Sequence, residues 1–308
     1  MKQRGKPYLL KENRLVSVGV PSPARQLFGA YKVRQVAIVY KDDERSADLA
    51  SRAAHILRER GLDIWVECSC LEHRGVPPKD FKPDLVISLG GDGTLLYAAR
   101  AWGLTGIPLF GVNLGHLGFL AETDPDHFTA LLRDILSGRY RVEKRMALEV
   151  SVERAGRVVN AALALNDVVV NKGALSRIIT INVDVREFGH WSIRADGVII
   201  ATPTGSTAYN LSAGGPVVYP TIPAVIVTPI CPFTLTSRPI VLPASFPVEM
   251  GVEAAPDQEV HLTVDGQVSI PLEPSDCITV QAHKVDINLI VNPQRKFIDV
   301  LRQKLHWA

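Results

Sequence analysis

A glycine-rich turn with a single carboxylate lies in the stretch LVISLGGDGTLLYAAR, residues 85–100. Gly90, Gly91 and Gly93 stand where an apolar run passes into a helical pattern, and such turns let backbone N–H groups approach a phosphate. Asp92 sets a negative charge among them, which would repel a phosphate unless the carboxylate has a task. The carboxylate either caps the helix, which stabilises it by roughly 1 kcal/mol, or takes part in chemistry.

This turn matches neither of two common phosphate motifs. A Walker loop needs a Lys followed by Ser or Thr after the glycines, and a dinucleotide fingerprint needs the spacing GxGxxG. Phosphate contacts would therefore come from backbone amides and from the hydroxyl of Thr94. A second glycine-containing loop, GVNLGHLGFLAET (111–123), follows the next apolar run and is expected at the same ligand.

Two polar segments stand out in the second half of the chain. LNDVVV (165–170) places Asn166 beside Asp167 in an otherwise apolar run, where buried polar side chains need partners. RADGVIIATPTGSTAYNLSAGGP (194–216) gathers hydroxyl and amide side chains around glycines, which suits hydrogen bonding to a nucleoside or a phosphate. A strand end and a capped turn are the structural alternatives for these two segments.

Apolar runs and helical patterns alternate between residues 35 and 140. We expect strands at 35–41, 62–67, 84–91 and 107–113, and helices at 44–60, 94–102 and 125–136. This alternation predicts an α/β domain with a parallel sheet and helices on both faces. Ligands of such sheets bind beyond the carboxyl ends of the strands, and the 90–94 turn follows one of these ends.

After about residue 140 the apolar residues alternate with period two, which predicts an all-β sandwich. A helical break is expected near 204–212, and Pro293 begins a closing amphipathic helix. The expected domains are a basic arm at 1–34, an α/β domain at 35–140, a β-sandwich at 141–292 that binds the second ligand, and a helix at 293–308 that returns to the first domain.

Composition narrows the class of partner. In 308 residues, 34 basic side chains nearly balance 32 acidic ones, so neither nucleic acid nor an anionic membrane is the expected partner. The four cysteines form no paired metal spacing, and only Cys68 and Cys70 are close in sequence, which indicates reduced thiols. Apolar runs stay short of the roughly 18 residues of a spanning helix, so a cytoplasmic protein is expected. The basic arm is either a solvated tail or a site for an anion or partner.

Six motifs together resemble the NAD kinase family. They are, in order, GGDGT (90–94), NLGHLGF (113–119), ALND (164–167), RADG (194–197), TPTGSTAYNLSAGGP (202–216) and VDGQ (264–267). GGDGT alone is less specific, because diacylglycerol and sphingosine kinases have a similar turn and phosphofructokinases a related one. The resemblance covers about residues 33–306 and implies an N-terminal domain like those of phosphofructokinases and diacylglycerol kinases.

The resemblance implies transfer of the γ-phosphoryl group of ATP to the 2′-hydroxyl of the adenosine ribose of NAD, giving NADP and ADP. Asp92 would be the general base, beside a triphosphate bound by Gly90, Gly91, Gly93 and Thr94. The residues implied to bind NAD are Asn166, Asp167, Arg194, Asp196, Thr204, Thr207, Ala208, Tyr209 and Ser212. Mg²⁺ would accompany ATP and be held mainly by phosphate oxygens and water, with no dedicated protein ligands.

The segment Arg194–Asp196 resembles one that reaches the NAD of a neighbouring subunit, which implies a homodimer or homotetramer. Two alternatives remain: a lipid kinase with the same turn, and a regulatory module that binds NAD or NADP without catalysis. The sequence leaves open the choice between ATP and polyphosphate, the choice between NAD and NADH, feedback by NADP or NADPH, and the role of His116.

Overall fold

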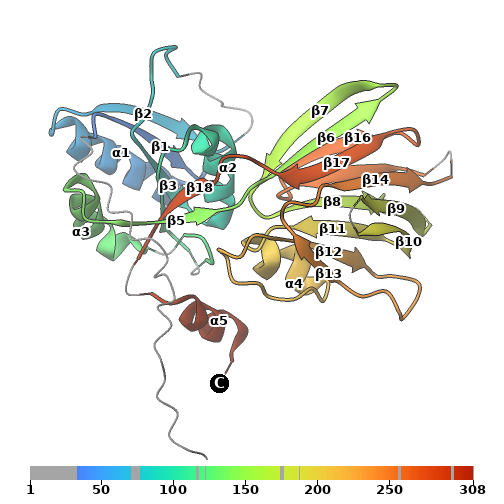
Figure 1. Cartoon of the computed structure of the whole chain (residues 1–308). Helices are drawn as coiled ribbons and strands as arrows, with labels where there is room; N and C mark the ends of the chain where they lie inside the picture. The colour runs from blue at the N-terminus through green and yellow to red at the C-terminus, as the bar shows by residue number, and fades with distance from the viewer. Residues whose placement is uncertain are drawn as a thin grey trace, which may run out of the picture.

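The computed structural model describes residues 33–70, 77–115, 118–121, 123–173, 177–186, 188–255, 258–292 and 295–307. These residues form an α/β lobe and a β lobe, which lie side by side (Figure 1). The basic arm expected at 1–34 lies outside the described residues except for its last two, and His116 lies outside them as well.

A six-stranded sheet forms the centre of the α/β lobe. Its strand order is β2 (Asp63–Cys68), β1 (Gln35–Tyr40), β3 (Leu85–Gly90), β4 (Leu109–Asn113), β18 (Ile287–Val291), β5 (Arg141–Arg145). The first five of these run parallel and β5 runs antiparallel to β18. The parallel sheet predicted for residues 35–140 is confirmed, with small shifts at the strand ends.

Helices cover both faces of this sheet (Figure 1). They are α1 (Glu44–Arg58), α2 (Asp92–Trp102), the short η2 (Gly103–Thr105) and α3 (Pro125–Leu136). Alternate residues of β1 explain the arrangement: Val36 and Ile38 pack with α1 and α3, whereas Ala37 and Val39 pack with α2. The sheet is therefore apolar on both faces, as parallel sheets are.

Two six-stranded antiparallel sheets form the β lobe. One has the order β10 (Gly189–Ala195), β9 (Ile179–Val185), β14 (Val248–Glu253), β17 (Cys277–Ala282), β6 (Leu148–Arg154), β7 (Arg157–Ala164). The other has the order β13 (Ile240–Pro243), β12 (Ala224–Ile230), β11 (Gly197–Ala201), β8 (Asp167–Lys172), β15 (Val260–Val264), β16 (Val268–Leu272). Inward residues of both sheets, such as Val150, Ile181 and Ile200, enclose one core. The antiparallel β domain predicted from the period-two pattern is confirmed.

Two strands expected in the β lobe belong instead to the parallel sheet. Strand β18 pairs with β4, where Leu289 lies beside Leu109, and β5 pairs with β18. The sequence pattern on both sides of residues 283–286 predicts strands of the β lobe. In the structure, the chain crosses at these residues from β17 in the β lobe to β18 in the α/β lobe. Alternation with period two predicts a strand but does not indicate which sheet it joins, and this explains the error.

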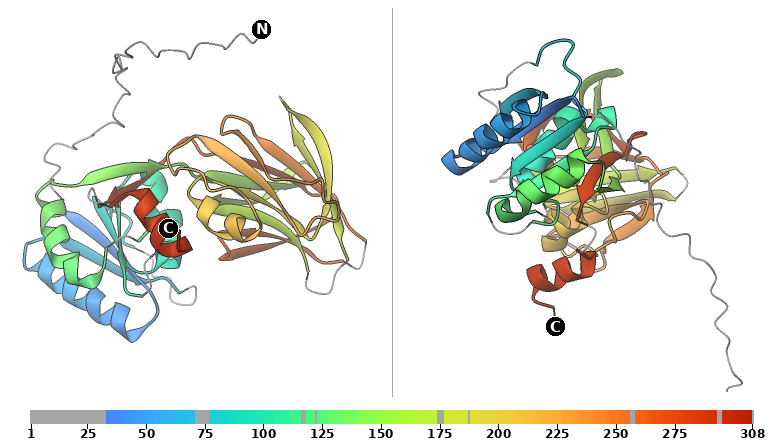
Figure 2. Two further views of the ribbon diagram at one scale, coloured as in Figure 1. Left: turned by 90° about the horizontal axis from the view of Figure 1, so that it is seen from below. Right: turned by 90° about the vertical axis from the view of Figure 1, so that its left-hand side faces the viewer.

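Short helices complete the described chain. They are η3 (Gly205–Thr207), α4 (Tyr209–Ser212) and α5 (Phe297–Leu305), the red helix near the C-terminus in Figure 2. Helix α5 contacts both lobes, since the ring centroid of Phe297 lies 5.5 Å from that of Tyr219 and the Lys304 ammonium lies 5.8 Å from the ring of Phe119. None of the helices that the structure describes is long and apolar enough to cross a bilayer.

Candidate functional site

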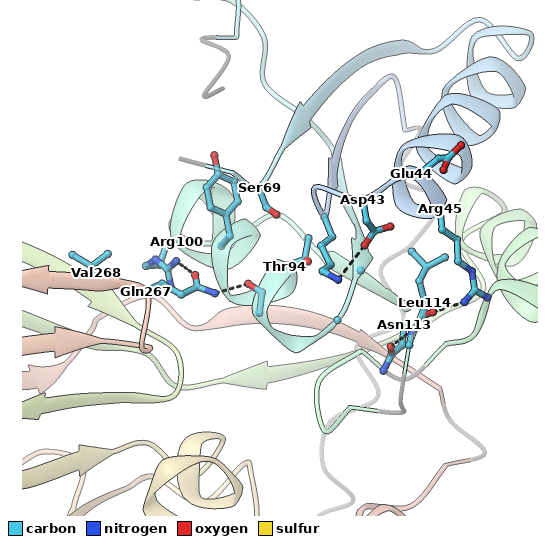
Figure 3. A pocket seen from close by; sticks show the side chains of 16 residues that line it. Asp43, Glu44, Arg45, Ser69, Thr94, Arg100, Asn113, Leu114, Gln267 and Val268 are labelled. Carbon is cyan, nitrogen blue, oxygen red and sulfur yellow. Dashed lines mark hydrogen bonds and ion pairs between the residues drawn. The ribbon is translucent and has the colours of Figure 1, made fainter. Parts of the chain in front are cut away.

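A cleft of about 1040 Å³ opens at the carboxyl end of the parallel sheet (Figure 3). It is lined by the segments that follow β1, β2, β3 and β4, and by Gln267 and Val268 of the β lobe. Gly90, the last residue of β3, is paired with Asn113, the last residue of β4, so both glycine-containing loops begin at this edge. The cleft therefore lies where ligands of parallel sheets bind.

The predicted phosphate turn lines this cleft with all four of its residues, Gly90, Gly91, Gly93 and Thr94. Gly91 is the N-cap of α2 and forms no side-chain capping bond, so the first turn of the helix presents backbone N–H groups and the positive end of the helix dipole. Lys41, Arg45 and Arg100 line the same cleft. This arrangement suits a polyanion such as a triphosphate.

Asp92 does not cap α2, because Gly91 holds the cap position. Its carboxylate accepts three backbone hydrogen bonds from the loop after β4: Oδ2 from Phe119 N at 2.8 Å, and Oδ1 from Leu120 N at 3.1 Å and Ala121 N at 3.0 Å. A carboxylate has about four acceptor positions. Among the described residues, one acceptor position on Oδ2 therefore stays open for a substrate hydroxyl.

The close approach of this loop depends on Gly118. A Cβ atom built at Gly118 would lie 1.9 Å from Oδ1 of Asp92, far inside van der Waals contact. Gly115, in the same motif, has room for a methyl group, since its Cβ would lie 3.9 Å from the nearest atom, Oδ1 of Asn113. The glycines of the second loop therefore have different roles, and Gly118 is the one that lets Asp92 hold the loop.

A chain of polar contacts joins the phosphate turn to the β lobe. Arg100 of α2 forms an ion pair with Asp265, with Nη1 2.9 Å from Oδ2, and also donates to Gln267. Gln267 donates from Nε2 to the carbonyl of Gly93 at 2.9 Å (Figure 3). The carboxylate of Asp265 accepts the backbone N–H groups of residues 165–167 at 3.2, 2.8 and 3.3 Å. Asp265 thus fixes the turn that carries Asn166 and Asp167.

Asp167 is a buried carboxylate beside a second one. It is 4% exposed, and burial together with the negative charge of Asp265 raises its pKa to about 7. The same burial raises the pKa of Asp265, against the opposing effects of its backbone donors and Arg100. A polar side chain held in this way at the end of an apolar strand is typical of a binding site.

The hydroxyl-rich segment packs directly on this turn. The carbonyl of Asn166 accepts Thr202 N at 2.8 Å, and a Cβ atom at Gly205 would lie 2.0 Å from the same oxygen. Beneath the segment, Nη1 of buried Arg145 lies 3.5 Å from Oγ1 of Thr204. The structure therefore brings Asn166, Asp167 and Thr204 together, as the motifs predict.

The remaining predicted residues divide into two groups. Thr207 ends η3, Tyr209 and Ser212 lie on α4, and Ala208 lies between these two helices; Tyr209 is 46% exposed. Arg194 and Asp196 lie elsewhere, because they come just before Gly197, the first residue of β11. Ala201, at the other end of β11, is the residue that pairs with Asp167. Five strand residues span roughly 17 Å. Within this chain, Arg194 and Asp196 therefore lie outside the site that Asn166 marks.

Five contributors were not assigned from the sequence: Lys41, Arg45, Arg100, Asp265 and Gln267. Helical spacing offered a signal for Arg100, because it lies seven residues after Gly93 and thus on the same face of α2. Asp265 and Gln267 belong to the VDGQ motif, which the resemblance singled out without roles. Lys41 is the first residue after β1 and had no sequence signal.

A cationic cleft at the edge of a parallel sheet, with a second polar site in an adjoining β lobe, is the arrangement expected of an enzyme that handles a phosphorylated nucleotide. The ATP-NAD kinase N-terminal domain matches residues 36–140, and the ATP-NAD kinase C-terminal domain matches residues 165–291. The chain belongs to the ATP-NAD kinase family and is a kinase.

Curated relatives agree with this assignment. The chain is 44% identical to the NAD kinase of Geobacter sulfurreducens over 90% of this chain and 99% of the relative. It is 44% identical to the NAD kinase of Syntrophobacter fumaroxidans, with the same shares covered. These relatives favour neither the lipid kinase nor the regulatory module.

Solved structures agree as well. Yeast NADH kinase, solved with NADH, has a TM-score of 0.77 at 27% identity and covers 90% of this chain and 89% of its own. An NAD kinase from Archaeoglobus fulgidus, solved with ATP, has a TM-score of 0.71 at 27% identity, covering 89% of this chain and 100% of its own.

Proposed function

We propose that the cleft binds ATP and that the Asn166 turn with the hydroxyl-rich segment binds NAD, whose 2′-hydroxyl on the adenosine ribose is phosphorylated to give NADP. The observation that carries this proposal is the polar chain Gly93–Gln267–Arg100–Asp265, which holds the phosphate turn and the Asn166 turn in one arrangement. The solved relatives contain ATP in one case and NADH in the other, which supports these two nucleotides as the classes of ligand.

Asp92 is the general base of this proposal. A carboxylate is a far weaker base than a ribose alkoxide, so Asp92 does not ionise the hydroxyl before attack. In a loose phosphoryl-transfer transition state the nucleophile loses its proton late, and an aligned carboxylate accepts it as the new bond forms. The three backbone donors fix the orientation of Asp92, and the remaining acceptor position on Oδ2 receives the hydroxyl.

The cleft fits a magnesium ion that arrives with the nucleotide. Mg²⁺ binds in such sites through one or two carboxylates together with phosphate oxygens and water. The carboxylates that line the cleft are Asp43 and Glu44, and Asp43 already pairs with Lys41 at 3.1 Å and caps α1 at Ser46 N. Glu44 and the phosphate oxygens would hold the ion. When bound, it neutralises negative charge on the triphosphate.

Three further features belong to the proposal. The segment Arg194–Asp196 lies far from its own chain's Asn166, which supports contact with the NAD of a second subunit in a homo-oligomer. A cytoplasmic location accords with substrates that are soluble nucleotides. The α/β lobe is also proposed to be related to those of phosphofructokinases and diacylglycerol kinases, through the glycine turn.

Gly91 offers a direct test of which substrate occupies the cleft. A Cβ atom at Gly91 meets nothing within 4 Å, so Gly91→Ala preserves the fold, yet its methyl group enters the space beside the helix N-terminus. Calorimetric titration should show ATP binding weakened by roughly tenfold or more, equivalent to about 1.4 kcal/mol, with NAD binding unchanged. Gly251→Ala, equally free of contacts and located in β14, is the control. Loss of NAD binding with normal ATP binding would reverse the assignment.

A further inference from the structure

Two cysteines flank Ser69, one of the residues that line the cleft. Cys68 ends β2, and Cys70 follows two residues later in the bend after the strand. Backbone N–H of Cys70 donates to Sγ of Cys68 at 3.3 Å. Neither cysteine is in a disulfide, and Cys68 is buried whereas Cys70 is half-buried.

The neighbouring strand adds a carboxylate to this pair. Strands β1 and β2 run parallel with Tyr40 beside Cys68, and Asp42 follows two residues after the end of β1. One ligand atom from each of Asp42, Cys68 and Cys70 lies within 4.8 Å of the others. The sequence spacing of the cysteines alone did not indicate a site, because the third donor comes from the turn between β1 and α1.

We propose that Asp42, Cys68 and Cys70 form a site for Zn²⁺. Two thiolates and a carboxylate are donors that zinc accepts, with Zn–S of about 2.3 Å and Zn–O of about 2.0–2.2 Å in a tetrahedral arrangement. Such an arrangement separates neighbouring donors by roughly 3.5–3.8 Å, so side-chain movements of about 1 Å bring the three atoms to the ion. Three protein ligands leave a fourth position for water.

The donor set selects zinc over the magnesium that accompanies ATP. Mg²⁺ takes oxygen ligands in octahedral geometry, whereas soft sulfur donors select zinc or Cu(I). Asp42 favours zinc over Cu(I), because a carboxylate is a hard ligand. Zinc binds thiolates, so both thiols lose their protons and about two protons are released for each ion bound.

The proposed zinc ligands are direct neighbours in sequence of residues that line the cleft. Lys41 and Asp43 flank Asp42, Ser69 stands between the two cysteines, and all three of these flanking residues line the cleft. An ion bound to Asp42, Cys68 and Cys70 therefore joins the turn between β1 and α1 to the end of β2. If ATP occupies the cleft, as the proposed function has it, zinc changes the KM for ATP; zinc binding itself does not depend on that assignment.

The test measures metal binding on the full chain with Co²⁺ as a spectroscopic substitute and Zn²⁺ as competitor. The wild-type protein should bind one Co²⁺ with a sulfur-to-cobalt charge-transfer band, which Zn²⁺ abolishes. Cys70→Ser and Asp42→Asn should each weaken binding by more than about 100-fold, because even loss of an outer-shell partner weakens metal sites 10–100-fold. Cys231→Ser and Cys277→Ser, at exposed cysteines of the β lobe, are the controls and should bind as the wild type does.

Several results would overturn the proposal. These are the absence of the charge-transfer band in the wild type, binding that survives in Cys70→Ser, binding that is lost in the Cys231→Ser or Cys277→Ser controls, and a Cys68–Cys70 disulfide in place of a metal complex. Calorimetry in two buffers of different ionisation enthalpy measures the protons released, and a value near zero would also contradict thiolate ligation. An enzyme that fails to make NADP but binds zinc would contradict the proposed function and leave the zinc site intact.

Discussion

Arg100 of α2 and Asp265 of the β lobe form an ion pair of 2.9 Å between the two lobes. The side chain of Asp265 is fully buried, and that of Arg100 is 12% exposed. Asp265 also accepts the backbone N–H groups of the Asn166 turn, while Arg100 stands on the helix that begins at the phosphate turn. The pair therefore links the helix that follows the phosphate turn to the Asn166 turn across the two lobes.

Removal of Arg100 should destabilise the protein strongly. Arg100→Met leaves the charge of Asp265 buried without its cation, and breaking such a pair costs about 3–5 kcal/mol. Urea unfolding measures this free energy. Arg52→Met is the matched control, because its pair with Asp48 is about two-thirds exposed and contributes only about 0–1 kcal/mol. Equal losses in the two variants would contradict a special role for the buried pair.

Gly118→Ala should reduce turnover while the protein still folds and binds ATP. The new methyl group would collide with Oδ1 of Asp92, so the carboxylate or its loop must move, and misplacement by about 1 Å can lower rates by roughly 10²-fold. Steady-state kinetics measures the effect on kcat. Gly251→Ala, in β14 where nothing lies within 4 Å of the new methyl group, should stay close to the wild type. Comparable kcat values for the two alanine variants would show that the Asp92 contact is not needed.

Asp167 should make stability depend on pH. The pKa of Asp167 is about 7 in the folded chain, whereas its ordinary value is 3.8. Between pH 3.8 and about pH 7 the folded protein therefore keeps a proton on Asp167 that the unfolded chain has released. The free energy of unfolding therefore falls as pH rises through this window and levels off above about pH 7. Asp167→Asn cannot ionise, and relative to the wild type it should gain about 2–3 kcal/mol between about pH 5 and pH 8.

The matched control for this titration is Asp80→Asn, at an exposed aspartate. Urea unfolding at the two pH values should show no differential gain for that variant. If the free energy of unfolding of the wild type instead rises between about pH 5 and pH 8, relative to that of Asp167→Asn, the raised pKa is contradicted.

The fold was largely predictable because its two halves have different hydrophobic periods. Residues 35–140 alternate strands with helical patterns, and the helix expected at 125–136 is α3, whose N-cap Asp124 accepts a hydrogen bond from His127 N at 3.0 Å. The return of β18 to the parallel sheet was not predictable. Its inward residues, Ile287 and Leu289, would suit either lobe, and only long-range pairing with β4 decides between them.

The candidate site was predictable to the extent that its residues stand in local motifs. The phosphate turn and the Asn166 turn are contiguous in sequence, so their glycines and polar side chains could be recognised directly. The cations of the cleft, such as Lys41 and Arg45, come from the segment after β1 and are brought there by the sheet. The separation of Arg194 from Asn166 was likewise invisible, because it depends on the direction and length of β11.

The most direct test of the account is NADP formation by the purified protein with NAD, ATP and Mg²⁺, measured through an NADP-specific dehydrogenase, with Asp92→Asn assayed beside the wild type. A general base contributes about 10²–10⁴-fold to a rate, so the variant should lose activity by that factor while it still binds ATP. Near-normal turnover by Asp92→Asn would contradict the central claim, that Asp92 accepts the proton of the attacking ribose hydroxyl.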